Sequence, residues 1–389
     1  MAYRYAIIGT GRQGIAAAYD LGKFGDAEEI ILGDLDGAVA AKAAERINAL
    51  LGRPVARGVQ MDAGNPMSLR PILKGITGFV SGVHFPLNPA LTDLAIEIGA
   101  HMCDFGGNTD VVRTQLARDA DAKRAGVTVV PDCGMGPGLN VSLATFVMAL
   151  LDEAREVLIW DGGLPEKPEP PWNYAMTFNI GGLTNEYYGH AYFLKAGKLT
   201  EVPCLEGYEV LKFPAPVGDL EAFVTSGGLS TAPWTFEGKL QRLENKTLRY
   251  PGHWVQLKAF SDLGLLEPEA IPVGGQKVVP RDVFHALLEP KIHRPNVHDV
   301  CVMRVKAVGK KIGRDAEAVV ELVDHYDNAT GFTAMQRLTG WHASIIAILA
   351  ARGKIPRGAL PVELAVPGKT IVDEARLRGL EVRHTVTVA

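Results

Sequence analysis

The feature that most constrains the fold is a glycine-rich turn between a strand and a helix near the N-terminus. Residues Tyr3–Ile8 form an apolar run rich in aromatic and β-branched side chains, and residues 9–14 read GTGRQG. A helical, Ala-rich segment follows at 15–24, and a second strand at 30–32 ends in Gly33-Asp34. This order of strand, glycines, helix, strand and acid predicts a βαβ unit whose helix N-terminus receives the phosphates of a dinucleotide.

The residues of this turn have distinct expected roles. Gly9 permits the tight turn, Gly11 lets the backbone approach a pyrophosphate, and Gly14 permits close packing of helix on strand. Arg12 and Gln13 open the helix and are predicted cofactor contacts. The Arg12 side chain either reaches a phosphate or is an ordinary solvated helix residue.

The acid that ends the second strand indicates which dinucleotide binds. Asp34 lies about 20 residues after Gly14, the usual position of the ribose-binding acid. A carboxylate there accepts hydrogen bonds from both ribose hydroxyls and repels a 2′-phosphate. Asp36 strengthens that repulsion. The sequence therefore predicts NAD rather than NADP as the cofactor.

Strands and helices continue to alternate through the first third of the chain. Further strands are predicted at residues 55–61, 78–83, 101–104 and 127–130, and further helices at 38–51, 67–73, 90–99 and 111–124. Six strands separated by helices imply parallel pairing through right-handed crossovers. Residues 1–135 are thus predicted to form a Rossmann domain, a doubly wound parallel sheet of the α/β class.

Two further cofactor-side positions follow from this sheet. Asp62 ends the third strand, where it either lines the adenine pocket or caps the next helix. His84 and Phe85 follow the fourth strand, next to the expected nicotinamide position. We take Asp62 and Phe85 as candidate cofactor contacts. His84 is a candidate substrate contact, with a purely structural histidine as the alternative.

The rest of the chain does not continue this alternation of strands and helices. Short strand-like runs at 157–160, 208–213 and 300–308 are separated by long loops rich in Pro and Gly, and 167–171 is a Pro-rich turn. Residues 136–331 are therefore predicted to be an α+β domain with a mainly antiparallel sheet, used for substrate binding and oligomerisation. Residues 332–389 are predicted to pack back on the first domain, as a helix at 332–352 and a tail ending in a helix and a strand.

Composition excludes several other classes of protein. The chain has 40 Lys and Arg against 44 Asp and Glu, a net charge of −4, which disfavours a nucleic-acid partner. None of the four cysteines forms a C-x-x-C pair, so we expect neither a metal site nor a disulfide framework. The apolar runs are far shorter than the roughly 20 residues of a membrane span. We expect a cytoplasmic protein that does not associate with membranes.

Four later motifs resemble the saccharopine dehydrogenase-like family, and in particular its lysine 6-dehydrogenase branch. They are DCGMGPGLN at 132–140, WDGGLP at 160–165 followed by Pro170-Pro171, TLRYPGH at 247–253 and RLTG at 337–340. The resemblance implies NAD-dependent oxidative deamination of the ε-amino group of L-lysine. The products would be ammonia and 2-aminoadipate 6-semialdehyde, which closes to a cyclic imine. It also implies a homodimer or a homotetramer.

The candidate catalytic and substrate-binding residues lie in or near these motifs. Arg249 is suited to clamp the substrate carboxylate, or forms an ordinary salt bridge. His253 is a base, a substrate contact or a structural histidine. Asp132 binds an ammonium, orients water or caps a helix. Cys133 is a contact or a small buried packing residue, and Tyr187 lines the pocket or packs. Asp161 and Glu186 are further possible ammonium partners.

Two other functions remain as alternatives. A relative that oxidises a secondary amine, such as a saccharopine or carboxynorspermidine dehydrogenase, should need a second cationic clamp, for which Lys195, Lys212 and Arg242 are available. A protein of another class would bind NAD(H) as a redox sensor and turn over no amine.

Overall fold

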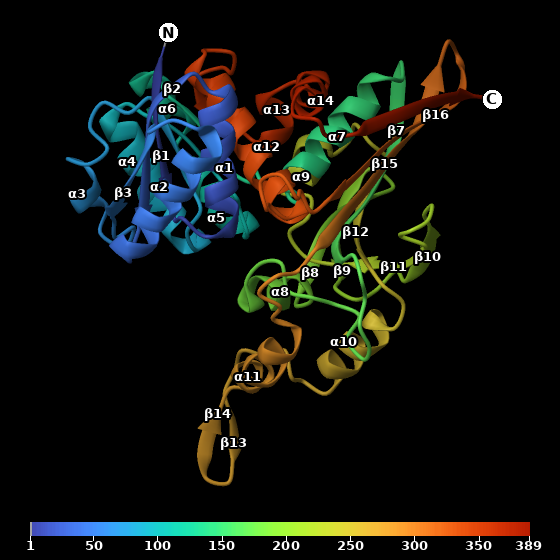
Figure 1. The fold of residues 1–389 in the computed structure, drawn as a ribbon. Helices are drawn as coiled ribbons and strands as arrows, with labels where there is room; N and C mark the ends of the chain where they lie inside the picture. Colours follow the sequence, from blue (N-terminus) through green and yellow to red (C-terminus); the bar gives the residue numbers. More distant parts are fainter. Residues whose placement is uncertain (1) are drawn as a thin grey trace.

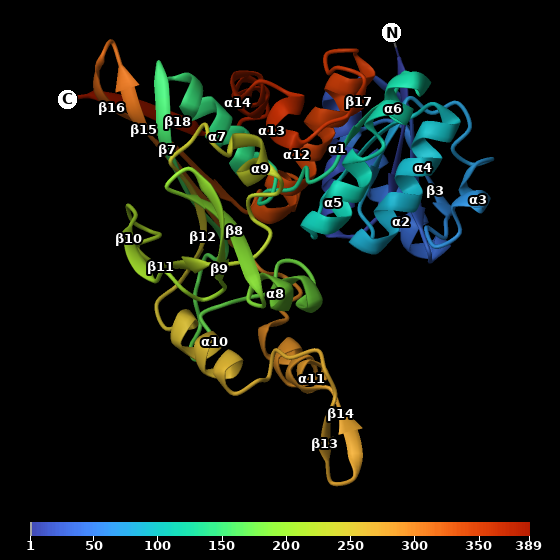
Figure 2. The same cartoon turned by 180° about the vertical axis from the view of Figure 1, so that it is seen from behind.

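The computed structural model describes residues 2–389, which form two large sheets with helices packed around them and one small two-stranded sheet (Figure 1 and Figure 2). The first sheet is wholly parallel, and the second is antiparallel except at one pair of strands. The predicted fold class is confirmed: a doubly wound parallel sheet is followed by an α+β domain with a mainly antiparallel sheet.

The first sheet is built almost wholly from the N-terminal third. Its strands are β1 (Tyr3–Ile8), β2 (Ala27–Asp34), β3 (Ala56–Gln60), β4 (Gly78–Ser81), β5 (His101–Asp104), β6 (Thr128–Val130) and β17 (Gly358–Ala359). They lie in the order β17, β6, β5, β4, β1, β2, β3. The order reverses beside β1, which makes the carboxyl ends of β1 and β4 the switch point where such sheets bind ligands.

Helices on both faces cover this sheet. They are α1 (Arg12–Phe24), α2 (Gly37–Leu51), α3 (Pro66–Leu69), the 3₁₀ turn η1 (Phe85–Leu87), α4 (Asn88–Ile98), α5 (Thr109–Leu116) and α6 (Asp119–Ala125). The prediction of one helix over 111–124 is wrong, because the helix is interrupted between α5 and α6. No Gly or Pro marks the break, and the separate α6 packs against β17, a strand from the far end of the sequence.

The second sheet is longer than the sequence indicated. Its strands are β7 (Glu153–Pro165), β8 (His190–Lys195), β9 (Lys198–Pro203), β10 (Glu209–Lys212), β11 (Asp219–Val224), β12 (Arg242–Arg249), β15 (Asp299–Lys311), β16 (Arg314–His325) and β18 (Val382–Val388). The one parallel pair joins β12 to β7. This pairing places the carboxyl ends of both strands, and the side chains there, at the same edge of the sheet.

The helices of this domain lie around that sheet and beyond its end. They are α7 (Leu139–Ala149), α8 (Ile180–Glu186), α9 (Ala232–Phe236), α10 (His253–Asp262) and α11 (Pro280–Ile292). A small hairpin, β13 (Ile271–Val273) and β14 (Gln276–Val278), precedes α11 and projects away from the body (Figure 1).

The C-terminal segment joins the two domains. It contains α12 (Ala334–Ala351), α13 (Val362–Ala365) and α14 (Gly368–Leu377). Thr333 and Gln336 form a capping box that starts α12. A Cβ on Gly340 would lie 2.7 Å from the backbone nitrogen of Ala17, so α12 lies closely against α1. The buried Asp20 of α1 also pairs with Arg378, with Nε 2.9 Å from Oδ1.

The prediction that the whole C-terminal tail packs on the first domain is wrong for its last strand. β18 pairs antiparallel with β16, so the chain ends in the second sheet. The alternating sequence of residues 382–388 suits this free sheet edge, and a local pattern does not reveal which sheet offers an edge.

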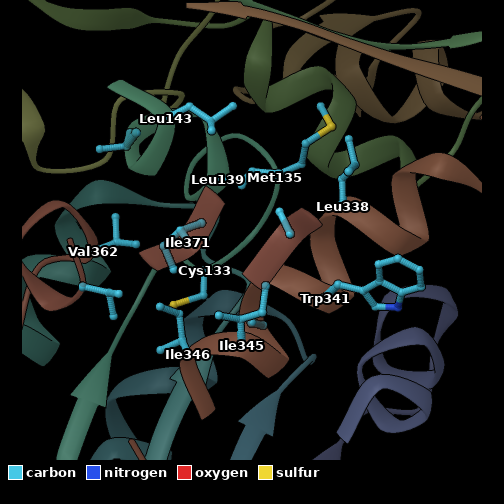
Figure 3. Packing of buried hydrophobic residues seen from close by; sticks show 14 of the residues in the cluster. Cys133, Met135, Leu139, Leu143, Leu338, Trp341, Ile345, Ile346, Val362 and Ile371 are labelled. Carbon is cyan, nitrogen blue, oxygen red and sulfur yellow. The ribbon is translucent and has the colours of Figure 1, made fainter. Parts of the chain in front are cut away.

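The core between the two domains is apolar. Figure 3 shows the segment that follows β6 packed against α12, with Cys133 beside Ile345 and Ile346, and Leu143 and Ile371 nearby. All five side chains are buried. No helix within residues 2–389 is long and apolar enough to cross a membrane.

Candidate active site

A cavity of about 390 Å³ lies between the two domains. One side, which we name the glycine wall, is formed by residues 82–85, 105–107 and 134–137, which follow β4, β5 and β6. The other side, the charged wall, carries Asp161, Glu186, Arg249 and Arg281. The glycine wall stands at the carboxyl edge of the parallel sheet, where open α/β sheets bind ligands, and the volume is typical of a small-molecule site.

The loop after β1 has the geometry that a dinucleotide needs. Gly9 has a φ of +98°, and a Cβ there would lie 2.7 Å from the carbonyl oxygen of Gly82. A Cβ on Gly14 would lie 2.1 Å from the oxygen of Gly9. No side chain caps the helix after Gly11, so the N–H groups of its first turn are available to a phosphate.

The acid at the end of β2 stands beside this loop. Asp34 Oδ2 accepts hydrogen bonds from the backbone nitrogen of Thr10 at 3.0 Å and from its hydroxyl at 2.9 Å. The carboxylate is thereby held next to the phosphate-binding turn, the place from which it can reach a ribose. The residues present therefore fit a pyridine dinucleotide.

The other predicted cofactor-side residues separate into two groups. Gln13, His84 and Phe85 line the cavity. Arg12 donates through Nη1 to the carbonyl oxygen of Met176 at 3.2 Å, so it bridges the two domains.

Asp62 lies outside the cavity. Its Oδ1 accepts from the backbone nitrogen of Gly64 at 2.9 Å. This bond closes a turn ahead of α3, whose N-cap is Asn65 without a side-chain cap bond, so Asp62 does not cap that helix. Asp62 is not among the residues that line the cavity, so the prediction that it lines the cofactor pocket finds no support there.

Arg249, the predicted clamp, ends β12 and is only 3% exposed. Nε donates to the Tyr187 hydroxyl at 2.9 Å, Nη1 to the Leu248 carbonyl at 3.0 Å, and Nη2 to Glu186 Oε2 at 3.0 Å. Its guanidinium also lies 5.2 Å from the centre of the Tyr174 ring. A guanidinium has five N–H donors, so two remain for a ligand.

Two carboxyl groups face the cavity beside Arg249. Asp161 Oδ1 accepts from Asn245 at 2.8 Å, and Oδ2 accepts from Asn140 at 3.0 Å. Burial raises the pKa of Asp161 to about 6, although Asn245 and Arg249 lower it. Burial also raises the pKa of Glu186 to about 7, against the lowering effect of Arg249. Both groups therefore titrate close to neutral pH, as groups that hold or take a proton do.

Of the two carboxyl groups that line the cavity, Asp161 is the one in close contact with the glycine wall. A Cβ on Gly136 would lie 2.3 Å from Asp161 Oδ2. The two walls thus meet where a glycine faces a carboxylate. Asp161 lies in the WDGGLP motif, but the sequence alone did not distinguish it from the other acidic residues that could bind an ammonium.

Tyr187 and His253 lie behind the charged wall. The Tyr187 hydroxyl is 3.0 Å from His253 Nε2, and both residues are buried outside the main cavity. Burial and the neighbouring Arg249 lower the pKa of His253 well below its usual value. The structure places His253 where it supports Tyr187, away from the cavity that would hold a substrate.

Asp132 lies one layer beneath the glycine wall. It is 1% exposed with a φ of +58°, and a Cβ on Gly106 would lie 1.8 Å from its Oδ1. Burial raises the pKa of Asp132 to about 8, and the neighbouring Asp104 adds to this rise. Its Oδ1 is buried without a hydrogen-bond partner among the described residues, and the side chain does not line the cavity.

Cys133 is a packing residue in this structure, the second of the two roles considered for it. Its side chain is fully buried, and its thiol lies 3.3 Å from the Val130 carbonyl oxygen. Burial raises the pKa of the thiol well above its usual value. A thiol that stays protonated and has no access to the cavity is not a nucleophile.

The second cation of the cavity was missed in the sequence. Arg281 lies at the start of α11 and lines the charged wall, whereas Lys195, Lys212 and Arg242 do not. Those three were the wrong candidates. No motif surrounds Arg281 in the sequence. It reaches the site because the long segment between β12 and β15 folds back toward the cavity.

Comparison with known proteins agrees with this architecture. Residues 5–130 match the saccharopine dehydrogenase NADP binding domain, and residues 134–379 match the saccharopine dehydrogenase C-terminal domain. The second match covers more than half of the chain. The chain belongs to the saccharopine dehydrogenase family.

Curated relatives in this family match parts of longer proteins. Mouse (Mus musculus) mitochondrial alpha-aminoadipic semialdehyde synthase is 27% identical over 207 residues, 50% of this chain and 22% of that protein. A saccharopine dehydrogenase (NADP(+), L-glutamate-forming) from Pyricularia oryzae is 28% identical over 165 residues, 40% of this chain and 36% of that protein. The matched regions thus span well under half of these relatives.

The fold is shared with a solved structure over nearly its whole length. Apo saccharopine dehydrogenase (L-Glu forming) from Saccharomyces cerevisiae has a TM-score of 0.78 and 17% sequence identity, and the match covers 99% of this chain and 100% of that one. The family and this fold together identify the first domain as a pyridine nucleotide-binding domain.

Proposed function

We propose that this chain is an NAD-dependent amine dehydrogenase that oxidatively deaminates the ε-amino group of L-lysine. The observation that carries the proposal is the pair of carboxyl groups, Asp161 and Glu186, which face the glycine wall across one cavity. The family membership and the lysine-branch motifs support the same reaction.

The reaction requires a neutral amine. Free lysine has an ε-ammonium pKa near 10.4, so at neutral pH almost all of it is protonated. Asp161 lines the cavity beside Gly136 of the glycine wall, where a carboxylate can hold the ammonium and take its proton. A bound nicotinamide supplies the hydride acceptor. Loss of hydride leaves an iminium on the substrate, and water converts it to the aldehyde and ammonia.

The other end of the substrate needs a cation and an acceptor. Arg249 keeps two N–H donors for a carboxylate, and its partner Glu186 can accept from the α-ammonium. The Arg249 clamp thus remains our proposal. Arg249→Lys, which keeps the charge but not the fork of donors, should raise the KM for lysine at least tenfold.

The choice of NAD is part of the proposal. Asp34 stands at the ribose position and opposes a 2′-phosphate, although the matching family domain is described as NADP binding.

A second candidate is a dehydrogenase of a secondary amine such as saccharopine. One observation favours it: Arg281 gives the cavity the additional cation that a substrate with further carboxylates should need.

One assay separates the candidates. Reduced-nicotinamide absorbance is followed with NAD and either L-lysine or saccharopine at alkaline pH, beside an enzyme-free blank, and ammonia is measured. We expect the absorbance to increase with lysine and ammonia to be released. An increase in absorbance with saccharopine alone would support the second candidate instead. Tight NADH binding with no turnover of either would favour a redox sensor.

A further inference from the structure

We propose that Arg281, with His285 one turn later on α11, is a second anchor for the substrate carboxylate and selects amines that carry one. The inference rests on the proposed amine dehydrogenase function and adds a specificity-determining position to it. Both residues line the cavity.

Neutral groups hold the Arg281 side chain in place. Nε donates to the Leu266 carbonyl oxygen at 2.8 Å, and Nη1 donates to Asn185 Oδ1 at 3.3 Å. The guanidinium lies 4.5 Å from the centre of the Tyr188 ring. The Tyr188 hydroxyl is fixed in turn by Glu267 at 2.8 Å. The guanidinium is therefore oriented before any ligand arrives.

The charge of Arg281 is not matched, in contrast to that of Arg249. Arg249 pairs with Glu186 at 3.0 Å, whereas Arg281 forms no ion pair with any group in residues 2–389. Its Nη2 atom is buried and has no hydrogen-bond partner among the same residues. An unpaired donor of this kind is unfavourable, and a carboxylate is the group that best satisfies a guanidinium.

The two guanidiniums stand at one part of the cavity. Arg281 contacts Asn185, and Arg249 contacts Glu186, the next residue at the end of α8. A carboxylate that enters beside this helix end therefore meets both. Arg281 contributes the uncompensated positive charge of the pair.

His285 completes the recognition of an amino acid. The Thr184 hydroxyl donates to the Ile180 carbonyl at 3.0 Å, so at 2.7 Å from His285 Nε2 it accepts a hydrogen bond from that nitrogen. Burial and Arg281 lower the pKa of His285, which favours the neutral ring with Nδ1 as an acceptor. Nδ1 can then accept from the α-ammonium while Arg281 binds the carboxylate.

The test compares a substrate with and without its carboxylate. L-lysine and 1,5-diaminopentane share the reacting end, so kcat/KM is measured for both with wild type, Arg281→Met and Arg281→Lys. Arg281→Met should lower kcat/KM for lysine about 100-fold, mainly through KM, and leave 1,5-diaminopentane within about twofold. Arg281→Lys should recover part of the lysine activity. Arg294→Met, which removes a surface arginine paired with Glu169 outside the cavity, should change neither substrate.

The outcomes separate the inference from the function beneath it. An equal fall for both substrates, or no fall for either, overturns the role of Arg281 and leaves the dehydrogenase intact. NADH binding and thermal midpoint are measured for each variant, and lysine binding to the NADH complex is measured by calorimetry. Unaltered lysine affinity in Arg281→Met contradicts the inference. Failure of the wild type to oxidise or bind either amine overturns the proposed function and this inference with it.

Discussion

The two walls of the cavity differ in the residues that form them and in what those residues offer a ligand. The glycine wall exposes backbone to the cavity, and a Cβ on any of its glycines would meet a carbonyl oxygen or a side-chain atom within about 3 Å. The charged wall places two carboxyl groups and two guanidiniums around the same space. On the proposed function, the glycine wall supplies shape and the charged wall supplies proton chemistry. A substitution in one wall should therefore leave the function of the other wall measurable.

The largest expected effect is on the charged wall. Asp161→Asn removes the cavity carboxyl group beside the glycine wall, and loss of a proton-transfer group of this kind costs about 100- to 10,000-fold in rate. We expect a fall of about 1000-fold in kcat/KM for the amine with NADH affinity unchanged. In the wild type, kcat/KM should rise with pH between about 6 and 7, as Asp161 and Glu186 lose their protons. A variant that keeps this rising limb and near-normal rates would remove Asp161 from the chemistry.

The next effect tests the first domain alone. Asp34→Ala should weaken NAD binding and reduce the preference for NAD over NADP by about tenfold, because one charge-assisted contact is lost and one repulsion is relieved. The ratio of kcat/KM values for the two cofactors measures this. An unchanged ratio would show that Asp34 does not read the ribose.

A smaller effect concerns stability beneath the glycine wall. The folded-state pKa of Asp132, about 8, lies above its ordinary value near 4, so the native state binds a proton that the unfolded state has released. Wild-type stability should therefore fall as pH rises between about 5 and 8. Asp132→Asn lacks this titration. The thermal midpoint of the variant minus that of the wild type should therefore increase as pH rises over the same range. A constant difference across pH would contradict the account of Asp132.

The smallest effect should come from Cys133. Cys133→Ala removes a thiol that packs in the core, so kcat/KM should stay within about twofold and the free energy of unfolding should fall by about 1 kcal/mol. A loss of activity without loss of stability would restore a direct role for this residue.

The first domain was predictable because its signals are local. The strand, the glycines, the helix and Asp34 lie within about 35 consecutive residues, and each has its own physical requirement. The seventh strand, β17, was not predictable in the same way, because only the tertiary structure brings a two-residue strand from the end of the chain beside β6.

The charged wall was predictable only in part. Arg249 stood in a motif, and Asp161 and Glu186 were candidates without rank. Arg281 comes from α11, and its position depends on contacts with Leu266 and Asn185 that no spacing in the sequence reveals. Conversely, His253 and Tyr187 have the chemistry of site residues, yet burial places them behind the wall.

The most direct test of the account follows the label from L-lysine deuterated at both hydrogens of the ε-carbon. We predict that the reduced cofactor gains one mass unit at C4 of the nicotinamide, that ammonia appears in equal amount, and that kcat/KM falls with the heavy substrate. Reduced cofactor without deuterium, formed while lysine is consumed, would contradict the claim that this cavity removes hydride from the ε-carbon.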